Sequence, residues 1–257
     1  MIPEAEPADA PELPPYQGIA LRDVRVVTTP AQAEAACADL LASDAIGFDT
    51  ESKPTFLKGE KSTGPHLIQL ATDRIAYLFP IGAHPAREVL EVLKAILESE
   101  QTIKVGFGLS DDVKRLHAKL EILAVKVLDL SVALRTPGQR NDLGAKTAVA
   151  KFFGQKLQKS KKISTTNWAS PRLNEKQILY AADDAQVALR IFRHWIAHGG
   201  KIPPFKPPKP PRQHRPGNRR PAAAPAPAPA TVPASATAPA STATNAPATT
   251  HDQTGKH

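Results

Sequence analysis

The sequence predicts an α/β fold, with helices on both faces of a mixed β-sheet in a single three-layer domain. Two observations predict it. Three apolar runs, at 45–51, 66–71 and 75–79, are joined in succession and favour an antiparallel meander. From residue 85 onward, helical spacing of apolar residues alternates with short apolar runs, a pattern typical of a sheet flanked by helices.

Each element has its own local signal. Thr29 followed by Pro30 predicts a helix start, because threonine caps helices and proline fits the first helical position. Ser110 is expected to cap another helix, and Gly199-Gly200 to end the last one. The predicted strands are 24–27, 45–51, 66–71, 75–79, 103–107 and 125–128. The predicted helices are 30–43, 85–98, 110–120, 131–135, 143–153 and 174–197.

The two ends of the chain differ in composition from the middle. Residues 1–20 are rich in proline and acids, while residues 201–257 form a basic segment rich in proline, alanine and threonine. Neither segment has enough large apolar residues to bury a core, so both are predicted to be disordered. Residues 21–200 are left as one folded domain.

The formal net charge is +8, and the basic residues are clustered. Seven lysines and arginines lie from Lys201 to Arg220 with no acid among them, and four lysines lie from Lys156 to Lys162. Such runs attract polyanions such as nucleic acids, although a solubilising tail has the same composition. The single cysteine excludes an intrachain disulfide. Without a long apolar run or a signal peptide, we expect a cytoplasmic protein with no membrane partner.

The run Ala45–Glu51 ends in two carboxylates. Residues i and i+2 of a strand point to the same side, so Asp49 and Glu51 are expected to share a face. Two like charges at the end of an apolar strand indicate a divalent metal between them. A strand that runs out into a polar turn, with both acids solvated, explains this stretch alone equally well.

A second acidic pair, Asp111 and Asp112, follows the predicted strand 103–107. At ~100° per residue, Asp112 lies near the apolar stripe of the next helix and Asp111 lies opposite to it. Asp112 is therefore the carboxylate expected to face inward. The alternative is that both acids only interact with the helix dipole.

The third acidic site lies on the long helix predicted at 174–197. Tyr180 and Asp184 are four residues apart and share an apolar face, whereas Asp183 falls on a polar face. A carboxylate on an apolar face needs a partner, because burying it unpaired is costly. A metal ion would supply that partner, and so would a buried salt bridge to lysine or arginine.

Four carboxylates are thus expected to point inward with a tyrosine beside them: Asp49, Glu51, Asp112, Asp184 and Tyr180. Such a set can hold two divalent ions ~3.5 to 4 Å apart, which stabilises both the attacking and the leaving oxygen of a phosphodiester. Together with the basic runs, it predicts metal-dependent phosphodiester hydrolysis.

Three short motifs in this order resemble the DEDD superfamily of 3′–5′ exonucleases, in the tyrosine-type branch that includes ribonuclease D and the Werner-type exonuclease domain. The motifs are Asp49-Thr50-Glu51, Gly106 to Asp112, and Tyr180 to Asp184. Segments outside the three motifs also resemble the family, namely 66–71, Lys159-Ser160, Trp168, Leu173 and Gln177. The resemblance covers about residues 22–197 and implies a ribonuclease H-like fold.

The resemblance also implies a chemistry. Two Mg²⁺ or Mn²⁺ ions would be held by Asp49, Glu51 and Asp184, with Asp112 at longer range and the Tyr180 hydroxyl orienting the attacking water. The implied substrate is single-stranded or 3′-ended DNA or RNA, and the product is a nucleoside 5′-monophosphate. Candidate substrate contacts are Phe56, Phe107 and Trp168, which would stack on bases, and Lys159, Lys161 and Lys162. The alternatives are core packing for the aromatic residues and a solvated loop for the lysines.

Two other functions fit parts of this pattern. A catalytically silent exonuclease fold that binds nucleic acid explains the basic runs but does not require all five site residues. A metal-dependent phosphatase of small molecules explains the acids but not the basic runs. The sequence leaves the choice between DNA and RNA open, and the oligomeric state as well.

Overall fold

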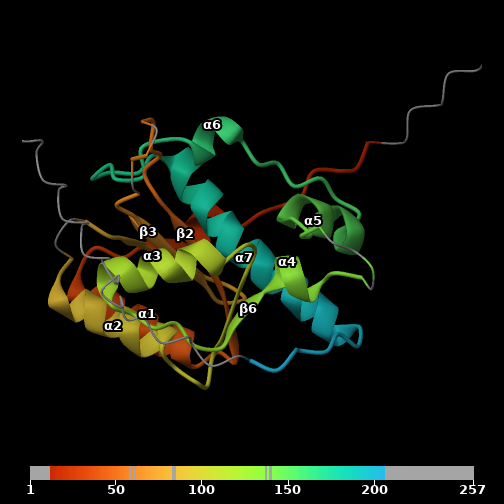
Figure 1. Cartoon of the computed structure of the whole chain (residues 1–257), viewed down its shortest axis with the longest axis horizontal. Helices are drawn as coiled ribbons and strands as arrows, with labels where there is room; N and C mark the ends of the chain where they lie inside the picture. The colour runs from red at the N-terminus through yellow and green to blue at the C-terminus, as the bar shows by residue number, and fades with distance from the viewer. Residues whose placement is uncertain are drawn as a thin grey trace, which may run out of the picture. The chain divides into compact units, whose positions relative to one another are not determined.

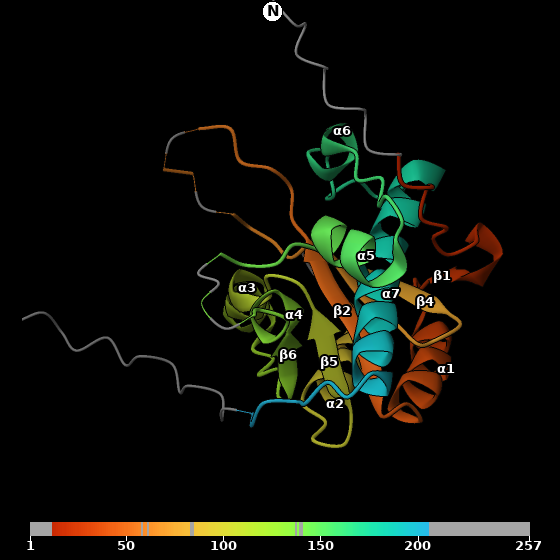
Figure 2. The same cartoon turned by 90° about the vertical axis from the view of Figure 1, so that its right-hand side faces the viewer.

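The computed structural model describes residues 12–57, 59–60, 62–82, 85–136, 138 and 141–205. These residues form a six-stranded mixed sheet with helices on both faces, which confirms the predicted fold class (Figures 1 and 2). The basic run beyond Phe205, predicted to be disordered, lies outside the described residues.

The sheet has the strand order β1-β4-β3-β2-β5-β6. Strands β2, β3 and β4 are antiparallel neighbours, as the three apolar runs predict, while β5 is parallel to β2, β6 to β5, and β1 to β4. Strand β2, which ends in the first pair of acids, therefore lies in the interior of the sheet. The strand bounds are β1 Val24–Val26, β2 Ala45–Glu51, β3 Leu67–Ala71, β4 Ala76–Pro80, β5 Ile103–Gly106 and β6 Val127–Asp129.

Helices α1 and α2 run side by side, and together with α3 they pack on one face of the sheet (Figure 1). The long helix α7 crosses the other face over β2, and α5 packs against it (Figure 2). No helix in the described part of the chain is long and apolar enough to span a membrane. The helix bounds are α1 Pro30–Leu41, α2 Arg87–Leu97, α3 Ser110–Leu120, α4 Leu130–Ala133, α5 Ala145–Phe153, α6 Lys161–Ser164 and α7 Glu175–Ala197, with a 3₁₀ turn η1 at Leu21–Asp23.

Of the two helix caps predicted at N-termini, the one at Thr29 is confirmed and the one at Ser110 is not. Thr29 and Asn174 each form a capping box with the glutamine three residues later, so the first free N–H groups of α1 and α7 are satisfied. Ser110 differs from the prediction. It is the first residue inside α3, and Leu109 occupies the N-cap position without a side-chain hydrogen bond.

Strand β2 and helix α7 approach each other unusually closely at Gly47. A Cβ atom at this position would lie 1.9 Å from the Ala185 carbonyl oxygen, so only glycine fits here. The alternation of β2 sends Ile46 and Phe48 to the core under α1 and α2, and leaves Gly47 facing α7. The backbone of α7 therefore rests directly on the strand that carries the first acids.

The N-terminal segment 12–19 differs from the prediction of disorder up to residue 20. Its backbone pairs with the loop after α5, where Tyr16 N–H donates to Lys156 O at 3.0 Å. It also reaches α7, where Ile19 N–H donates to Asp183 Oδ1 at 2.7 Å. Composition did not reveal this segment, because backbone hydrogen bonds to distant residues hold it in place. We call residues 12–19 the N-terminal strap.

The strap changes the burial of one face of α7. The sequence places Asp183 and Gln186 on a solvated polar face, but Asp183 is half-buried and Gln186 is only 2 % exposed. Burial raises the pKa of Asp183 to about 6, although the hydrogen bond from Ile19 opposes this. The hydrogen bond from the strap lies on this face of α7, so the face at Asp183 is not open to solvent.

Candidate active site

Strand β2 presents Asp49 and Glu51 on the same face, towards α7, and both are half-buried. The backbone N–H of Thr50 donates to Asp49 Oδ1 at 2.9 Å and orients this carboxylate. The hydroxyl of Thr50 points to the opposite face of the strand. The pair of acids therefore faces the same helix, as the i, i+2 spacing predicts.

Helix α7 supplies Tyr180 and Asp184 from one side, four residues apart. Asp184 is 8 % exposed, and its charge acts on Tyr180, whose pKa burial and this charge raise to about 12. The Trp168 ring packs against the Tyr180 ring, with the centroids 6.0 Å apart. Because Gly47 lets α7 lie close to β2, the helix carboxylate and the strand carboxylates interact electrostatically.

Lys159 enters this group from the loop between α5 and α6. Its Nζ lies 2.7 Å from Asp184 Oδ1 and 5.8 Å from the centre of the Tyr180 ring. The buried salt bridge that the sequence left open for Asp184 is therefore present. The sequence assigned Lys159 to contacts with substrate, whereas in the structure it is paired with a carboxylate of the same protein.

The acids of this group resist ionisation. Burial raises the pKa of Asp49 well above its usual range, and the charges of Asp184 and Asp112 raise it further. Burial, followed by the charges of Asp49 and Asp184, raises the pKa of Glu51 to about 9. Burial also raises the pKa of Asp184, although the charge and hydrogen bond of Lys159 oppose it. The cluster thus contains more carboxyl groups than one lysine could neutralise if all of them were ionised.

Asp112 approaches the site from the opposite side of β2. It is 7 % exposed, while the side chain of Asp111 is 70 % exposed and paired with Lys114, so helical phase correctly selected the buried member of the pair. Asp112 accepts a hydrogen bond from the Thr50 hydroxyl at 2.5 Å and pairs with Arg115 at 3.4 Å. It acts on Asp49 through its charge rather than by direct contact.

The three aromatic candidates for base stacking occupy very different places. Phe56 is 81 % exposed in the loop after β2, next to Leu57 at 77 %. Phe107 is half-buried against the core beside α5. Trp168 is 1 % exposed and its indole N–H donates to Ser164 O, so core packing is correct for Trp168 and no base can reach its ring. Its contact is with Tyr180.

The short helix α6 was not expected from the sequence. It begins after Ser160, whose hydroxyl accepts from Ile163 N–H, and it displays Lys161 and Lys162 on the surface. The two lysines lie beyond Lys159 along the chain and are exposed, so they remain candidates for contact with a polyanion.

Gln69 is a site neighbour that the sequence reasoning missed. It lies directly opposite Asp49 in the β2–β3 ladder, is fully buried, and its side-chain amide has no hydrogen-bond partner within the described residues. A polar side chain at an inward strand position, within 66–71, was the available signal. An amide left unpaired beside a carboxylate indicates a polar site rather than ordinary core.

The chemistry of these side chains fits divalent ions such as Mg²⁺, because hard carboxylate oxygens outnumber the one lysine that faces them. Their arrangement is not that of a closed metal site. Within the part of the chain that the structure describes, no group of three or more His, Cys, Asp or Glu side chains is placed to hold a metal ion.

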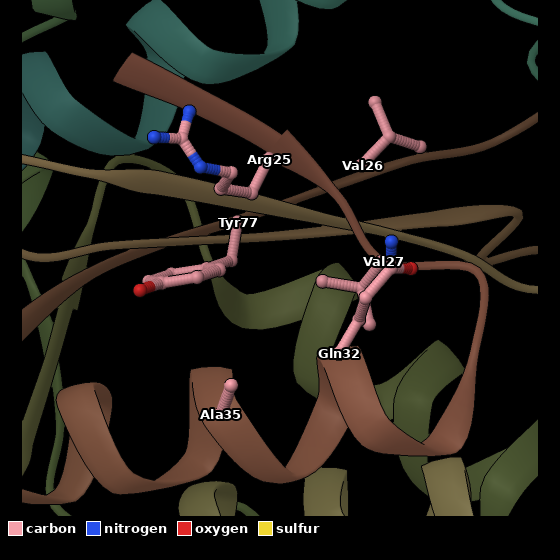
Figure 3. Close-up of a pocket in the computed structure, with 6 residues that line it drawn as sticks. All are labelled: Arg25, Val26, Val27, Gln32, Ala35 and Tyr77. Atoms are coloured by element: carbon pink, nitrogen blue, oxygen red, sulfur yellow. The ribbon is translucent and has the colours of Figure 1, made fainter.

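A separate pocket lies between β1, β4 and α1, lined by Arg25, Val26, Val27, Gln32, Ala35 and Tyr77 (Figure 3). Two of its polar side chains make hydrogen bonds that stabilise the fold. Tyr77 donates to Asp39 at 2.9 Å, and Gln32 completes the capping box of α1. None of the predicted site residues lines this pocket.

Comparison with known proteins places the chain in a family. The sequence profile of a 3′–5′ exonuclease domain matches residues 24–195, which include all five predicted catalytic residues. The chain belongs to the 3′–5′ exonuclease family. Members of this family typically use divalent metal ions. The resemblance drawn from the three motifs is thereby confirmed.

Relatives of this exonuclease domain are distant. The mouse bifunctional 3′-5′ exonuclease/ATP-dependent helicase WRN is 27 % identical over 151 residues, which is 58 % of this chain and 11 % of that protein. Human exonuclease 3′-5′ domain-containing protein 2 is 32 % identical over 109 residues, which is 40 % of this chain and 17 % of that protein. The chain therefore spans only a small part of these relatives.

Solved structures show the same fold. The Aedes aegypti Nibbler EXO domain has a TM-score of 0.56 at 24 % identity, covering 68 % of this chain and 88 % of that one. Escherichia coli RNase D has a TM-score of 0.57 at 24 % identity, covering 68 % of this chain and 46 % of that one. At this identity the likeness establishes the ribonuclease H-like fold alone.

Proposed function

We propose that this chain is a divalent-metal-dependent 3′–5′ exonuclease that removes nucleotides from the 3′ end of DNA or RNA and releases nucleoside 5′-monophosphates. The observation that carries the proposal is the cluster of Asp49, Glu51 and Asp184 with the Tyr180 hydroxyl, in a chain of this family. A Trypanosoma brucei RNase D, 20 % identical, was solved in complex with RNA U12, which supports a nucleic-acid substrate.

The side chains divide the work as follows. Asp49, Glu51 and Asp184 would hold Mg²⁺ or Mn²⁺, while Asp112 contributes negative charge from the other side of β2. When bound, such ions activate water and stabilise charge on the phosphodiester oxygens. The Tyr180 ring packs against Trp168, and its hydroxyl would orient the attacking water.

The substrate strand would meet side chains that are already exposed. Phe56 offers a ring face for stacking, a contact worth ~1 to 3 kcal/mol per base. Lys161 and Lys162 offer positive charge on α6. They follow within three residues of Lys159, which pairs with Asp184.

The proposal is tested with 5′-labelled single-stranded DNA, duplex DNA and RNA, each incubated with the full chain and Mg²⁺ or Mn²⁺. We expect shortening in single-nucleotide steps, and its abolition in Asp49→Ala. Asp111→Ala is the matched control, since it removes an exposed acid next to Asp112 and should keep full activity. If the protein binds the oligonucleotides but leaves them at full length with both metals, it is a nucleic-acid-binding module instead.

A further inference from the structure

Lys159 is held in place by the backbone on both sides. The preceding segment alternates, with Leu157 6 % exposed and Gln158 exposed, so that Lys159 points inward again. Lys156 N–H donates to Pro14 O at 2.8 Å in the N-terminal strap, and Ser160 caps α6. The inward direction of the Lys159 side chain therefore follows from the fold.

The ammonium group of Lys159 is much less exposed than the other lysines of its cluster. Its side chain is 28 % exposed, and that of Asp184 is 6 % exposed. Besides the 2.7 Å contact with Asp184 Oδ1, it lies over the Tyr180 ring at 5.8 Å and acts through its charge on Asp49 and Glu51. One cation thus contacts Asp184 and acts through its charge on both acids of β2.

An ammonium and a divalent ion would compete for Asp184 Oδ1. A magnesium ion needs carboxylate oxygens at ~2.1 Å, whereas Nζ already lies 2.7 Å from that oxygen, and the two positive charges repel each other. A divalent ion that binds this oxygen is therefore opposed by the charge of Lys159. The ammonium is tethered, so it competes at a high effective concentration.

We infer that Lys159 is the internal counter-cation of the carboxylate cluster. It positions Asp184 and Tyr180 when no divalent ion is bound, and it competes with a divalent ion for Asp184. This inference rests on the proposed function, because it assumes that the same carboxylates bind divalent ions. Lys159 is thus a positioning residue that lowers the affinity of the site for metal.

The test measures Mn²⁺ binding to the full chain without nucleic acid. Binding is monitored through the electron paramagnetic resonance signal of free Mn²⁺. We expect Lys159→Met to bind Mn²⁺ about tenfold more tightly than the unchanged protein, because a nearby positive charge is removed. Lys162→Met is the matched control. It loses the same charge from an exposed position on α6 and should stay within about twofold.

A second readout separates competition from simple structural support. In EDTA, Lys159→Met should melt at a lower temperature than the unchanged protein, because Asp184 loses its partner. Added Mn²⁺ should raise the melting temperature of Lys159→Met by more than it raises that of the unchanged protein. A residue with only a structural role would weaken Mn²⁺ binding when removed. If Lys159→Met does not fold, Lys159→Gln is measured, which keeps a hydrogen bond to Asp184 without the charge and should also bind Mn²⁺ more tightly.

The outcomes are distinct. Equal or weaker Mn²⁺ binding by the Lys159 variants, with Mn²⁺ binding by the unchanged protein intact, overturns the inference but leaves the proposed function standing. Equally tighter binding by Lys159→Met and Lys162→Met also overturns it, since general electrostatics would then be the cause. Failure of every variant to bind Mn²⁺ overturns the proposed function itself.

Discussion

The two halves of helix α7 belong to acidic groups that differ in burial and in the basic residue that pairs with them. In the N-terminal half, Asp184 shares a buried cluster with Asp49 and Glu51, and a single lysine faces them. In the C-terminal half, Arg193 binds Asp44 at 2.7 and 2.9 Å and Asp73 at 3.1 and 3.2 Å. The second group is largely exposed, with the side chain of Asp44 at 76 %.

The pKa values show what this difference means. A hydrogen bond from Arg193 lowers the pKa of Asp44, so its ionised form is favoured in the folded protein. Burial raises the pKa of Asp49, so its ionised form is disfavoured. Acids near Arg193 therefore contribute to folding, whereas acids near Lys159 are kept at the expense of stability. Retained instability of this kind is typical of functional sites.

The largest expected effect comes from neutralising one acid in each group. Asp49→Asn should reduce exonuclease activity at least about a thousandfold, because a metal ligand is lost. It should also raise the free energy of unfolding of the metal-free protein by ~1 to 2 kcal/mol, because a buried charge is removed. Asp44→Asn should keep activity and lose up to ~1 kcal/mol. Activity assays and urea unfolding in EDTA measure these effects for both variants. An Asp49→Asn protein that is less stable than the unchanged protein would contradict the contrast between the two acidic groups.

The next effect concerns the place where α7 crosses β2 between its two halves. Gly47→Ala puts a methyl group against the Ala185 carbonyl oxygen and should cost ~1 to 3 kcal/mol of stability. Activity should fall about a hundredfold, because Asp184 moves relative to Asp49. Gly144→Ala is the control, since open space surrounds that position. Full activity in a folded Gly47→Ala protein would show that the spacing is not critical.

The two halves should also respond oppositely to pH. The pKa of Glu51 is raised from 4.5 to about 9, so between these values the folded protein holds a proton that the unfolded chain has lost. Its contribution to the free energy of unfolding therefore falls as pH rises through this window, by at most about 1.4 kcal/mol per pH unit. The contribution of Asp44 is instead lost below its unfolded value of 3.8.

Urea unfolding of the metal-free protein from pH 3 to pH 9 would measure both limbs. Glu51→Gln should flatten the alkaline limb and leave the acid limb unchanged. An alkaline limb of equal slope in this variant would assign the effect to another group.

The smallest expected effect is the loss of the exposed network. Arg193→Met should lower the free energy of unfolding by about 1 kcal/mol, since exposed ion pairs are individually weak and this arginine holds two acids. The loss should shrink at high salt, because exposed charges are screened. Exonuclease activity per folded molecule should not change. A large loss of activity would mean that the two halves of α7 are coupled.

Local periodicity explains how much of the site could be predicted. The two-residue spacing of Asp49 and Glu51, the helical phase of Asp112 and the four-residue spacing of Tyr180 and Asp184 each depend on a single element. Such spacings fix which side chains share a face, whatever the element packs against. The strand bounds of β2 and the capping boxes of α1 and α7 follow from the same local rules.

Features that depend on distant partners could not be predicted. The strap is held by Lys156 and Asp183, far along the chain, and its own composition suggests disorder. The inward direction of Lys159 depends on that pairing, so the sequence offered only substrate contact or a solvated loop for this lysine. Phe56 and Trp168 are both aromatic residues near the motifs, yet only tertiary packing exposes one and buries the other.

The strap, residues 12–19, is hydrogen-bonded to residues close in sequence to the candidate active-site residues. Its hydrogen bonds end on Asp183, the neighbour of Asp184, and on Lys156, three residues before Lys159. Lys156 pairs with the strap through its backbone, so detaching residues 12–19 is expected to loosen the segment that directs Lys159 towards Asp184.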